Sequence, residues 1–136
     1  MLQDVAAWPQ WWPGVRSAEL LAPGDAHRVG SVHRLRWRAR MPYMVELEFR
    51  VEQVREPALM SGRSSGELEG TGIWRLIEQE GMTAVLYEWD VRTTRAWMNA
   101  LTPVARPLFA RNHDRVMRQG GEGLARRLGV SLLACS

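Results

Sequence analysis

The sequence predicts a domain of the α+β class, in which about six antiparallel strands form a curved sheet against one long C-terminal helix. Apolar and polar residues alternate in several segments between residues 15 and 92, which is the period of half-buried strands. The segment 103–128 instead repeats its apolar residues at helical spacing. Strands that follow one another before a single helix favour an antiparallel sheet packed on that helix. A length of 136 residues suits a single domain over 1–136.

The first elements are predicted to be short helices. Residues 2–8 have helical spacing, Pro9 is expected to break the helix, and a second turn is expected around Trp11-Trp12. The segment Trp8–Gly14 holds three of the seven tryptophans of the chain. Because indole rings are large and mostly apolar, several of them close together need a broad apolar surface to pack against.

The next segments are predicted to be strands, beginning with 15–21. In 33–40, His33, Leu35, Trp37 and Ala39 share one face and four arginines share the other. In 43–51, Tyr43, Val45, Leu47, Phe49 and Val51 point inward, and two glutamates and an arginine point outward. A hairpin about Met41-Pro42 would place the arginine row beside the glutamate row, and opposite charges across a strand pair favour one register.

Three more strands, over about 59–69, 72–79 and 83–92, precede the helix. In the last of them, Val85, Tyr87, Trp89 and Val91 share one face. Thr102-Pro103 has the order of a helix start, so the helix is expected over 103–128. Pro107 is expected to kink this helix, and Gly120-Gly121 to let another element pack closely against it.

Composition and charge limit the possible partners. The chain has 46% hydrophobic and 24% charged residues, and no apolar run approaches the roughly 18 residues of a membrane-spanning helix. It shows no secretion signal, and its single cysteine, Cys135, cannot form an internal disulfide, so we expect a cytoplasmic protein without membrane insertion. All 18 basic residues are arginine, so the pI of about 10.0 overstates a net charge of only +3. The arginines of the last helix indicate a solvated face, and we expect no nucleic-acid partner: Arg111, Arg115, Arg118, Arg126 and Arg127.

Several pieces of the chain, in their order and spacing, resemble the START/SRPBCC superfamily, which includes polyketide cyclase-like and lipid-transport-like domains. They are the Trp8–Gly14 cluster, Gly30, Met41-Pro42-Tyr43, and the segments 66–74, 87–91 and 112–124. The resemblance implies the helix-grip fold, in which a curved antiparallel sheet wraps around the C-terminal helix and leaves an apolar cavity between them.

One departure from the superfamily pattern concerns the start of the chain. Members usually begin with a strand that pairs with the final strand, here 83–92, and this sequence begins inside the first helix. Without that strand the backbone of 83–92 is an unpaired edge that is able to recruit another chain. We therefore expect either a first strand encoded upstream of residue 1 or a homodimer through the edge of 83–92.

The resemblance also implies which residues line the cavity. Taken one at a time, the inward aromatic residues are more simply explained as core, and a cavity somewhere within the set is the expectation. The polar members His33, Tyr43, Tyr87 and His113 would orient a ligand. The full predicted ligand-binding set is His33, Trp37, Tyr43, Phe49, Trp74, Tyr87, Trp89, Trp97, Phe109, His113 and Met117.

Three functions remain open. The first is binding or carrying a small hydrophobic or aromatic molecule, with no cofactor. The second is a polyketide cyclase or dehydratase, in which His33 or His113 would act with Tyr43 or Tyr87 as the acid/base pair. The third is a protein-interaction module that uses the exposed edge of 83–92.

Two other patterns have simpler explanations than a catalytic or metal site. Gly62-Arg63-Ser64-Ser65-Gly66 matches the G-x-S-x-G hydrolase pattern, which requires a strand-to-helix elbow. A strand is predicted to follow here, so a turn or bulge in a hairpin is expected instead. His27, His33, His113 and the cysteine lack metal-ligand spacing, so no metal is expected.

Overall fold

The computed structural model describes residues 2–38 and 43–134, with the side chains of 101, 102, 104–106, 108 and 109 left out of the description. Two short helices come first: a 3-10 helix, η1 (Val5–Ala7), and α1 (Trp8–Trp11). Six strands and one long helix follow: β1 (Val15–Ala22), β2 (Val32–Trp37), β3 (Val45–Arg55), β4 (Leu59–Gly66), β5 (Leu68–Gln79), β6 (Met82–Thr93) and α2 (Ala96–Leu128). Pro9 lies in the first turn of α1, where a proline is tolerated, so the expected helix break at this residue is wrong.

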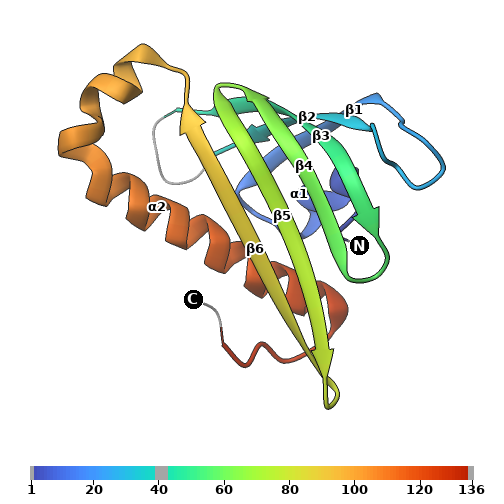
Figure 1. The fold of residues 1–136 in the computed structure, drawn as a ribbon. Coiled ribbons are helices and arrows are strands. Elements are labelled where there is room, and N and C mark those ends of the chain that lie inside the picture. The colour runs from blue at the N-terminus through green and yellow to red at the C-terminus, as the bar shows by residue number, and fades with distance from the viewer. Residues whose placement is uncertain (1, 39–42, 135–136) are drawn as a thin grey trace.

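The strands form one antiparallel sheet in the order β1-β2-β3-β4-β5-β6, which confirms the predicted α+β class and sheet. Figure 1 shows α2 leaving the end of β6 and running back past the sheet toward the N-terminal helices, which it contacts through α1. β1 and β6 are the two edges of the sheet. No helix in the described part of the chain is long and apolar enough to cross a bilayer.

The β2–β3 pairing confirms the predicted facing rows of charge. Arg34 lies opposite Glu48 and Arg36 lies opposite Glu46. The Arg34 Nη2 and Glu48 Oε1 atoms are 3.1 Å apart, and the Arg36 Nε and Glu46 Oε2 atoms 2.7 Å apart. The predicted turn at Met41-Pro42 lies outside the described residues. These exposed pairs stabilise the sheet little but favour the register that buries Leu35 and Leu47.

Predicted and observed boundaries differ notably at the β4–β5 turn and at the start of α2. The predicted strand over 59–69 is divided at Glu67, because Gly66 adopts a φ of +100° that side-chain-bearing residues rarely take, and the chain reverses there. α2 begins at Ala96 rather than at residue 103, so Pro103 and Pro107 lie inside the helix. The Thr102-Pro103 pair therefore marks an interior position, and Arg95, in extended conformation, is the N-cap.

The core lies on the inner face of the sheet and is dominated by indole rings. We call Trp8, Trp11 and Trp12 the tryptophan plug; all three are buried. The plug is fixed to α2, since Trp12 Nε1 donates a hydrogen bond of 2.8 Å to the carbonyl oxygen of Val116. A methyl group at Gly120 would lie 2.6 Å from the Trp12 ring, and one at Gly123 would overlap the carbonyl oxygen of Trp11. The expected close packing at the helix glycines is thus found at Gly120 and Gly123.

Candidate functional site

The inner face of the sheet is divided into a filled half and a half that is less covered. The tryptophan plug fills the first half, where ring centroids of Trp12 lie 4.8 Å from Trp37 and 5.7 Å from Trp74. Phe49 is buried there too, 6.1 Å from Trp8. These contacts give Trp37, Phe49 and Trp74 the surroundings of core residues.

Aromatic side chains continue from the plug along β5 and β6 toward the edge of the sheet. Tyr87 lies opposite Trp74 in the strand register, and their rings stack at 3.9 Å with an interplanar angle of 9°. Trp89 follows on the same face of β6, 5.8 Å from Tyr87. Both Tyr87 and Trp89 are half-buried. Burial raises the pKa of Tyr87 well above its ordinary value, so its phenol is neutral and able to donate a hydrogen bond.

A second aromatic pair joins the end of the sheet to the first turn of α2. The ring centroids of Tyr43 and Trp97 are 5.1 Å apart in an edge-to-face arrangement. Trp97 is 44% exposed, which is unusual for so large an apolar side chain. Burial raises the pKa of Tyr43, an effect that the positive charge of Arg95 opposes. We call Tyr87, Trp89 and Val91, which share the inward face of β6, the open half of the inner face.

The three histidines lie in different surroundings. His33 is 5% exposed, pairs with Phe49 in the strand register and has no partner for Nδ1 among the described residues. Burial is the main cause that lowers its pKa, against the opposing charge of Asp4, so the imidazole is neutral at pH 7. His27 and His113 are exposed, and Nδ1 of His113 is 3.8 Å from the Asp114 carboxylate.

The predicted acid/base pairs are not joined in the part of the chain that the structure describes. No hydrogen bond there links a histidine to Tyr43 or to Tyr87. Met117 is half-buried and packs against the core, whereas the side chain of Phe109 lies outside the described residues. The structure thus brings five aromatic members of the predicted set together and leaves His113 on the surface; the five are Trp37, Phe49, Trp74, Tyr87 and Trp89. Tyr43 and Trp97 form a separate pair.

A polar clasp that the sequence analysis missed holds the start of α2. The Glu67 carboxylate, in the β4–β5 turn, accepts hydrogen bonds from the backbone N–H of Glu46 at 2.6 Å and from Arg95 Nε at 2.6 Å. Arg95 Nη2 bonds the same carboxylate, and Thr94 Oγ1 donates to the carbonyl oxygen of Gly66 at 2.7 Å. Only two signals in the sequence indicate this clasp. Glu67 is an acidic residue after the turn glycine, and Arg95 is an arginine directly before the helix. They lie 28 positions apart, so no local pattern connects them.

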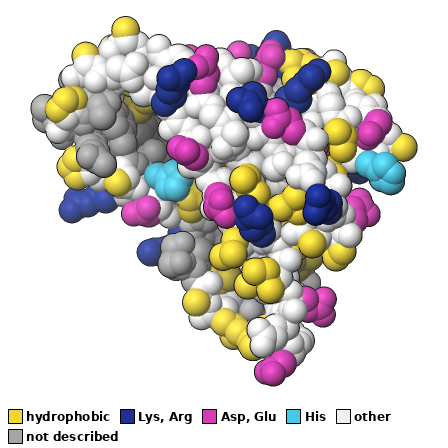
Figure 2. All heavy atoms as spheres, in the orientation of Figure 1, with side chains coloured by type: hydrophobic (Ala, Val, Ile, Leu, Met, Phe, Trp, Pro, Cys, Tyr) yellow, Lys and Arg dark blue, Asp and Glu magenta, His cyan; other side chains and the backbone are white. Residues whose placement is uncertain are grey.

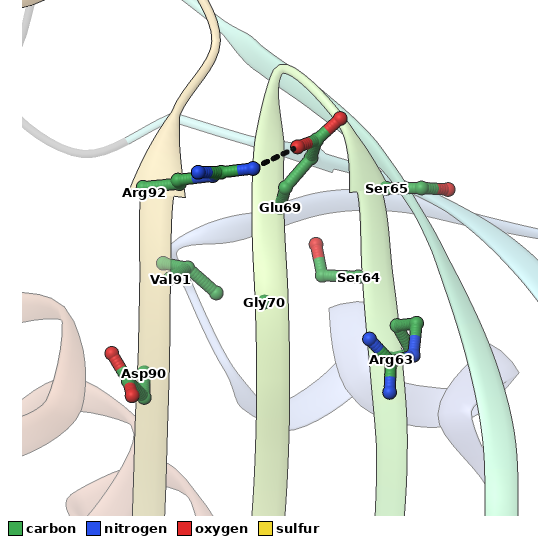
Figure 3. Close-up of a pocket in the computed structure, with 8 residues that line it drawn as sticks. All are labelled: Arg63, Ser64, Ser65, Glu69, Gly70, Asp90, Val91 and Arg92. Carbon is green, nitrogen blue, oxygen red and sulfur yellow. Dashed lines mark hydrogen bonds and ion pairs between the residues drawn. The ribbon is translucent and has the colours of Figure 1, made fainter.

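The outer face carries a hollow of about 520 Å³ over β4, β5 and β6 (Figure 3). Its rim includes Arg63, Asp90 and the ion pair between Arg92 Nη2 and Glu69 Oε2, which are 3.3 Å apart. Ser64 belongs to the G-x-S-x-G pattern and donates a 2.6 Å hydrogen bond to the carbonyl oxygen of Leu68. The pattern occupies the end of β4 and closes at Gly66, where the hairpin turn to β5 begins as expected, and no strand-to-helix nucleophile elbow exists there.

In residues 2–38 and 43–134, no group of three or more histidine, cysteine, aspartate or glutamate side chains could hold a metal ion. The arrangement on the inner face instead offers apolar area, indole and phenol rings, and two neutral hydroxyl donors.

Comparison with known proteins agrees with this geometry. A family model described as polyketide cyclase / dehydrase and lipid transport matches residues 1–129. No curated protein and no solved structure matches the chain significantly. The family match covers every strand of the sheet and both helical regions. The chain therefore belongs to the polyketide cyclase/dehydrase and lipid transport family, and has its hydrophobic ligand-binding fold.

Proposed function

We propose that this protein binds a small hydrophobic or aromatic molecule on the open half of the inner face, between β6 and the first turns of α2. The observation that carries the proposal is that the aromatic row continues past the tryptophan plug and that its side chains there stay partly exposed. Tyr87 and Trp89 are only half-buried, and Trp97 of α2 is 44% exposed. Large apolar side chains left in water near a concave face favour a ligand that covers them.

Burial of apolar area would supply the affinity. Covering roughly 200 Å² of these side chains at about 25 cal/mol per Å² stabilises a complex by roughly 5 kcal/mol, before the cost of association is subtracted. Stacking against the indole of Trp89 favours a planar ligand. The wall behind the ligand would be Trp37, Phe49 and Trp74, with Met117 below it.

Two hydroxyl groups would orient the bound molecule. Tyr43 and Tyr87 both have raised pKa values and stay protonated, so each is able to donate to a carbonyl or ether oxygen. His33 is buried beside Phe49, and its unpartnered Nδ1 would be a third polar group at the deep end. His113 is solvated in the unliganded protein, and we give it no part in the complex.

The proposal is tested by titrating the protein with a panel of planar apolar molecules and following intrinsic tryptophan fluorescence. At least one member should give a saturable quench or shift. Replacing Trp97 by alanine (Trp97→Ala) should raise the dissociation constant about tenfold, because the variant loses one wall of the site. Leu133→Ala, at an exposed position of the C-terminal tail, is the matched control and should bind as the wild type does. A flat titration across the whole panel would refute the proposal.

A further inference from the structure

We propose that the free edge of β6 pairs with β6 of a second copy of this chain, antiparallel, so that one sheet continues across two protomers. β6 is the last strand of the sheet, and Figure 1 shows no strand beyond it among the described residues. A strand edge presents a row of backbone N–H and C=O groups that another strand is able to satisfy.

The two edges of the sheet differ in how they are protected. β1 is irregular, with register shifts against β2 between Val15 and Ser17 and between Leu20 and Ala22. Such bulges twist an edge and prevent a further strand from adding to it. β6 pairs with β5 over twelve successive residues with no shift, and it contains no proline or glycine. Only the β6 edge is therefore regular enough to add a strand.

Exposed apolar side chains lie beside this edge. Ile77, Met82 and Leu86 share the outer face of the β5–β6 hairpin and are 51%, 53% and 47% exposed. Figure 2 shows hydrophobic side chains gathered toward the narrow lower end of the molecule, where Figure 1 places this hairpin. Every residue from 82 to 86 is exposed, so this half of the edge is uncovered.

The charges of β6 favour a second copy aligned about Tyr87. A two-fold pairing centred on residue 88 would place Glu88 opposite Glu88 of the partner subunit. One centred on residue 90 would place Asp90 opposite Asp90 of the partner subunit. A pairing centred on residue 89 would place Glu88 against Asp90. Like charges directly opposite one another destabilise a strand pair.

A pairing centred on Tyr87 avoids these contacts and aligns residues 82–92, as long a stretch as the pairing centred on residue 88 would align. It places Ala84 opposite Asp90 of the partner subunit and Leu86 opposite Glu88 of the partner subunit. On the inner face, Val85 meets Trp89 of the partner subunit. This two-fold pairing thus sets no like charges opposite one another, and each protomer uses the same surface, as in the isologous interface of a dimer.

Sedimentation velocity over a wide concentration range tests the inference, with two variants at one position. Ala84 is exposed and lies opposite Ile77 within its own chain, so a charge there meets no charged partner inside the protomer. Ala84→Glu should weaken the dimer about tenfold or more, because it faces Asp90 of the partner subunit. Ala84→Arg should leave the dimer unchanged or tighten it. Both should unfold at the wild-type temperature, which shows that the protomer is intact.

Three outcomes would overturn the inference. A wild-type protein that stays monomeric at every concentration excludes the interface. A dimer that neither variant affects is formed through another surface. Equal weakening by the glutamate and arginine variants contradicts the pairing centred on Tyr87 and points to contact through the apolar patch alone.

Discussion

His33 shows how one buried side chain links stability to pH. Its imidazole lies on the inner face of β2 against Phe49, and burial lowers its pKa. The unfolded chain, in which the histidine has its ordinary pKa near 6.5, therefore binds a proton more readily than the folded chain. The contribution of His33 to the free energy of unfolding is complete above about pH 6.5. It is lost as the pH falls through the lowered pKa that His33 has in the folded protein.

We expect His33→Gln to reduce this pH dependence, since glutamine does not titrate. The free energy of unfolding of the wild type should fall between pH 7 and the acid range, and that of the variant should fall less. Urea denaturation across this pH range measures the difference. His27→Gln, at an exposed position, is the control and should retain the wild-type slope. Parallel curves for His33→Gln and the wild type would show that another group causes the acid destabilisation.

Among the elements, the Glu67 clasp stabilises the junction of β6 and α2 more than interactions within the first turn of α2 do. The first turn of α2 has no side-chain cap and no acidic residue to complement its dipole. Glu67 instead holds Arg95, the N-cap residue, and the side chains of this ion pair are 27% and 30% exposed. The clasp thereby fixes where Trp97 enters the proposed site.

Replacing Glu67 by glutamine should loosen this junction. The loss of a charge-assisted, partly buried hydrogen bond is expected to cost about 1–2 kcal/mol of unfolding free energy. Backbone amides in the first turns of α2 should exchange faster with solvent, whereas those of β3 should not. Glu69→Gln is the matched control, because its partner Arg92 is largely exposed and the pair contributes little. Unchanged exchange at the start of α2 in Glu67→Gln would show that the clasp does not fix the helix.

The elements differed in how far local sequence predicted them. Alternation in 33–40 and 43–51 predicted the β2–β3 register, because two rows of opposite charge allow one alignment. The start of α2 was placed seven residues late, since Thr102-Pro103 has the local signature of a helix start while the true start depends on Glu67 in a distant turn. The division of the inner face could not be predicted either. Alternation shows that Phe49 and Trp89 both point inward, and only the position of the plug decides which of them is sealed.

In the molecule as a whole, contacts between the N-terminal helical region and α2 hold the first and last elements together. Trp11 and Trp12 precede β1, and they meet Gly120 and Gly123 in the final turns of α2. The indole hydrogen bond from Trp12 to Val116 spans 104 residues of sequence. All the strands of the sheet lie between Trp12 and Val116 in the sequence. This hydrogen bond therefore joins the N-terminal part of the fold to its last helix.

Gly123→Ala should therefore destabilise the whole protein, although alanine is the better helix former. The added methyl group would overlap the carbonyl oxygen of Trp11, and backbone cannot move aside as a side chain does. Overpacking of this kind costs about 1–3 kcal/mol, which thermal unfolding followed by circular dichroism would detect. Glu122→Ala, one residue away and exposed, should change the unfolding temperature little. Equal stability of Gly123→Ala and the wild type would mean that α1 and α2 are less closely packed than described.

The Trp12–Val116 bond also determines the order of events during synthesis. When a ribosome has made the sheet, the indole N–H of Trp12 still lacks its acceptor, because that part of α2 has not yet emerged. The nascent chain therefore carries an incomplete aromatic core until the part of α2 that contains Val116 has been made. Contacts of such long sequence separation form slowly and leave apolar surface accessible to chaperones in the meantime.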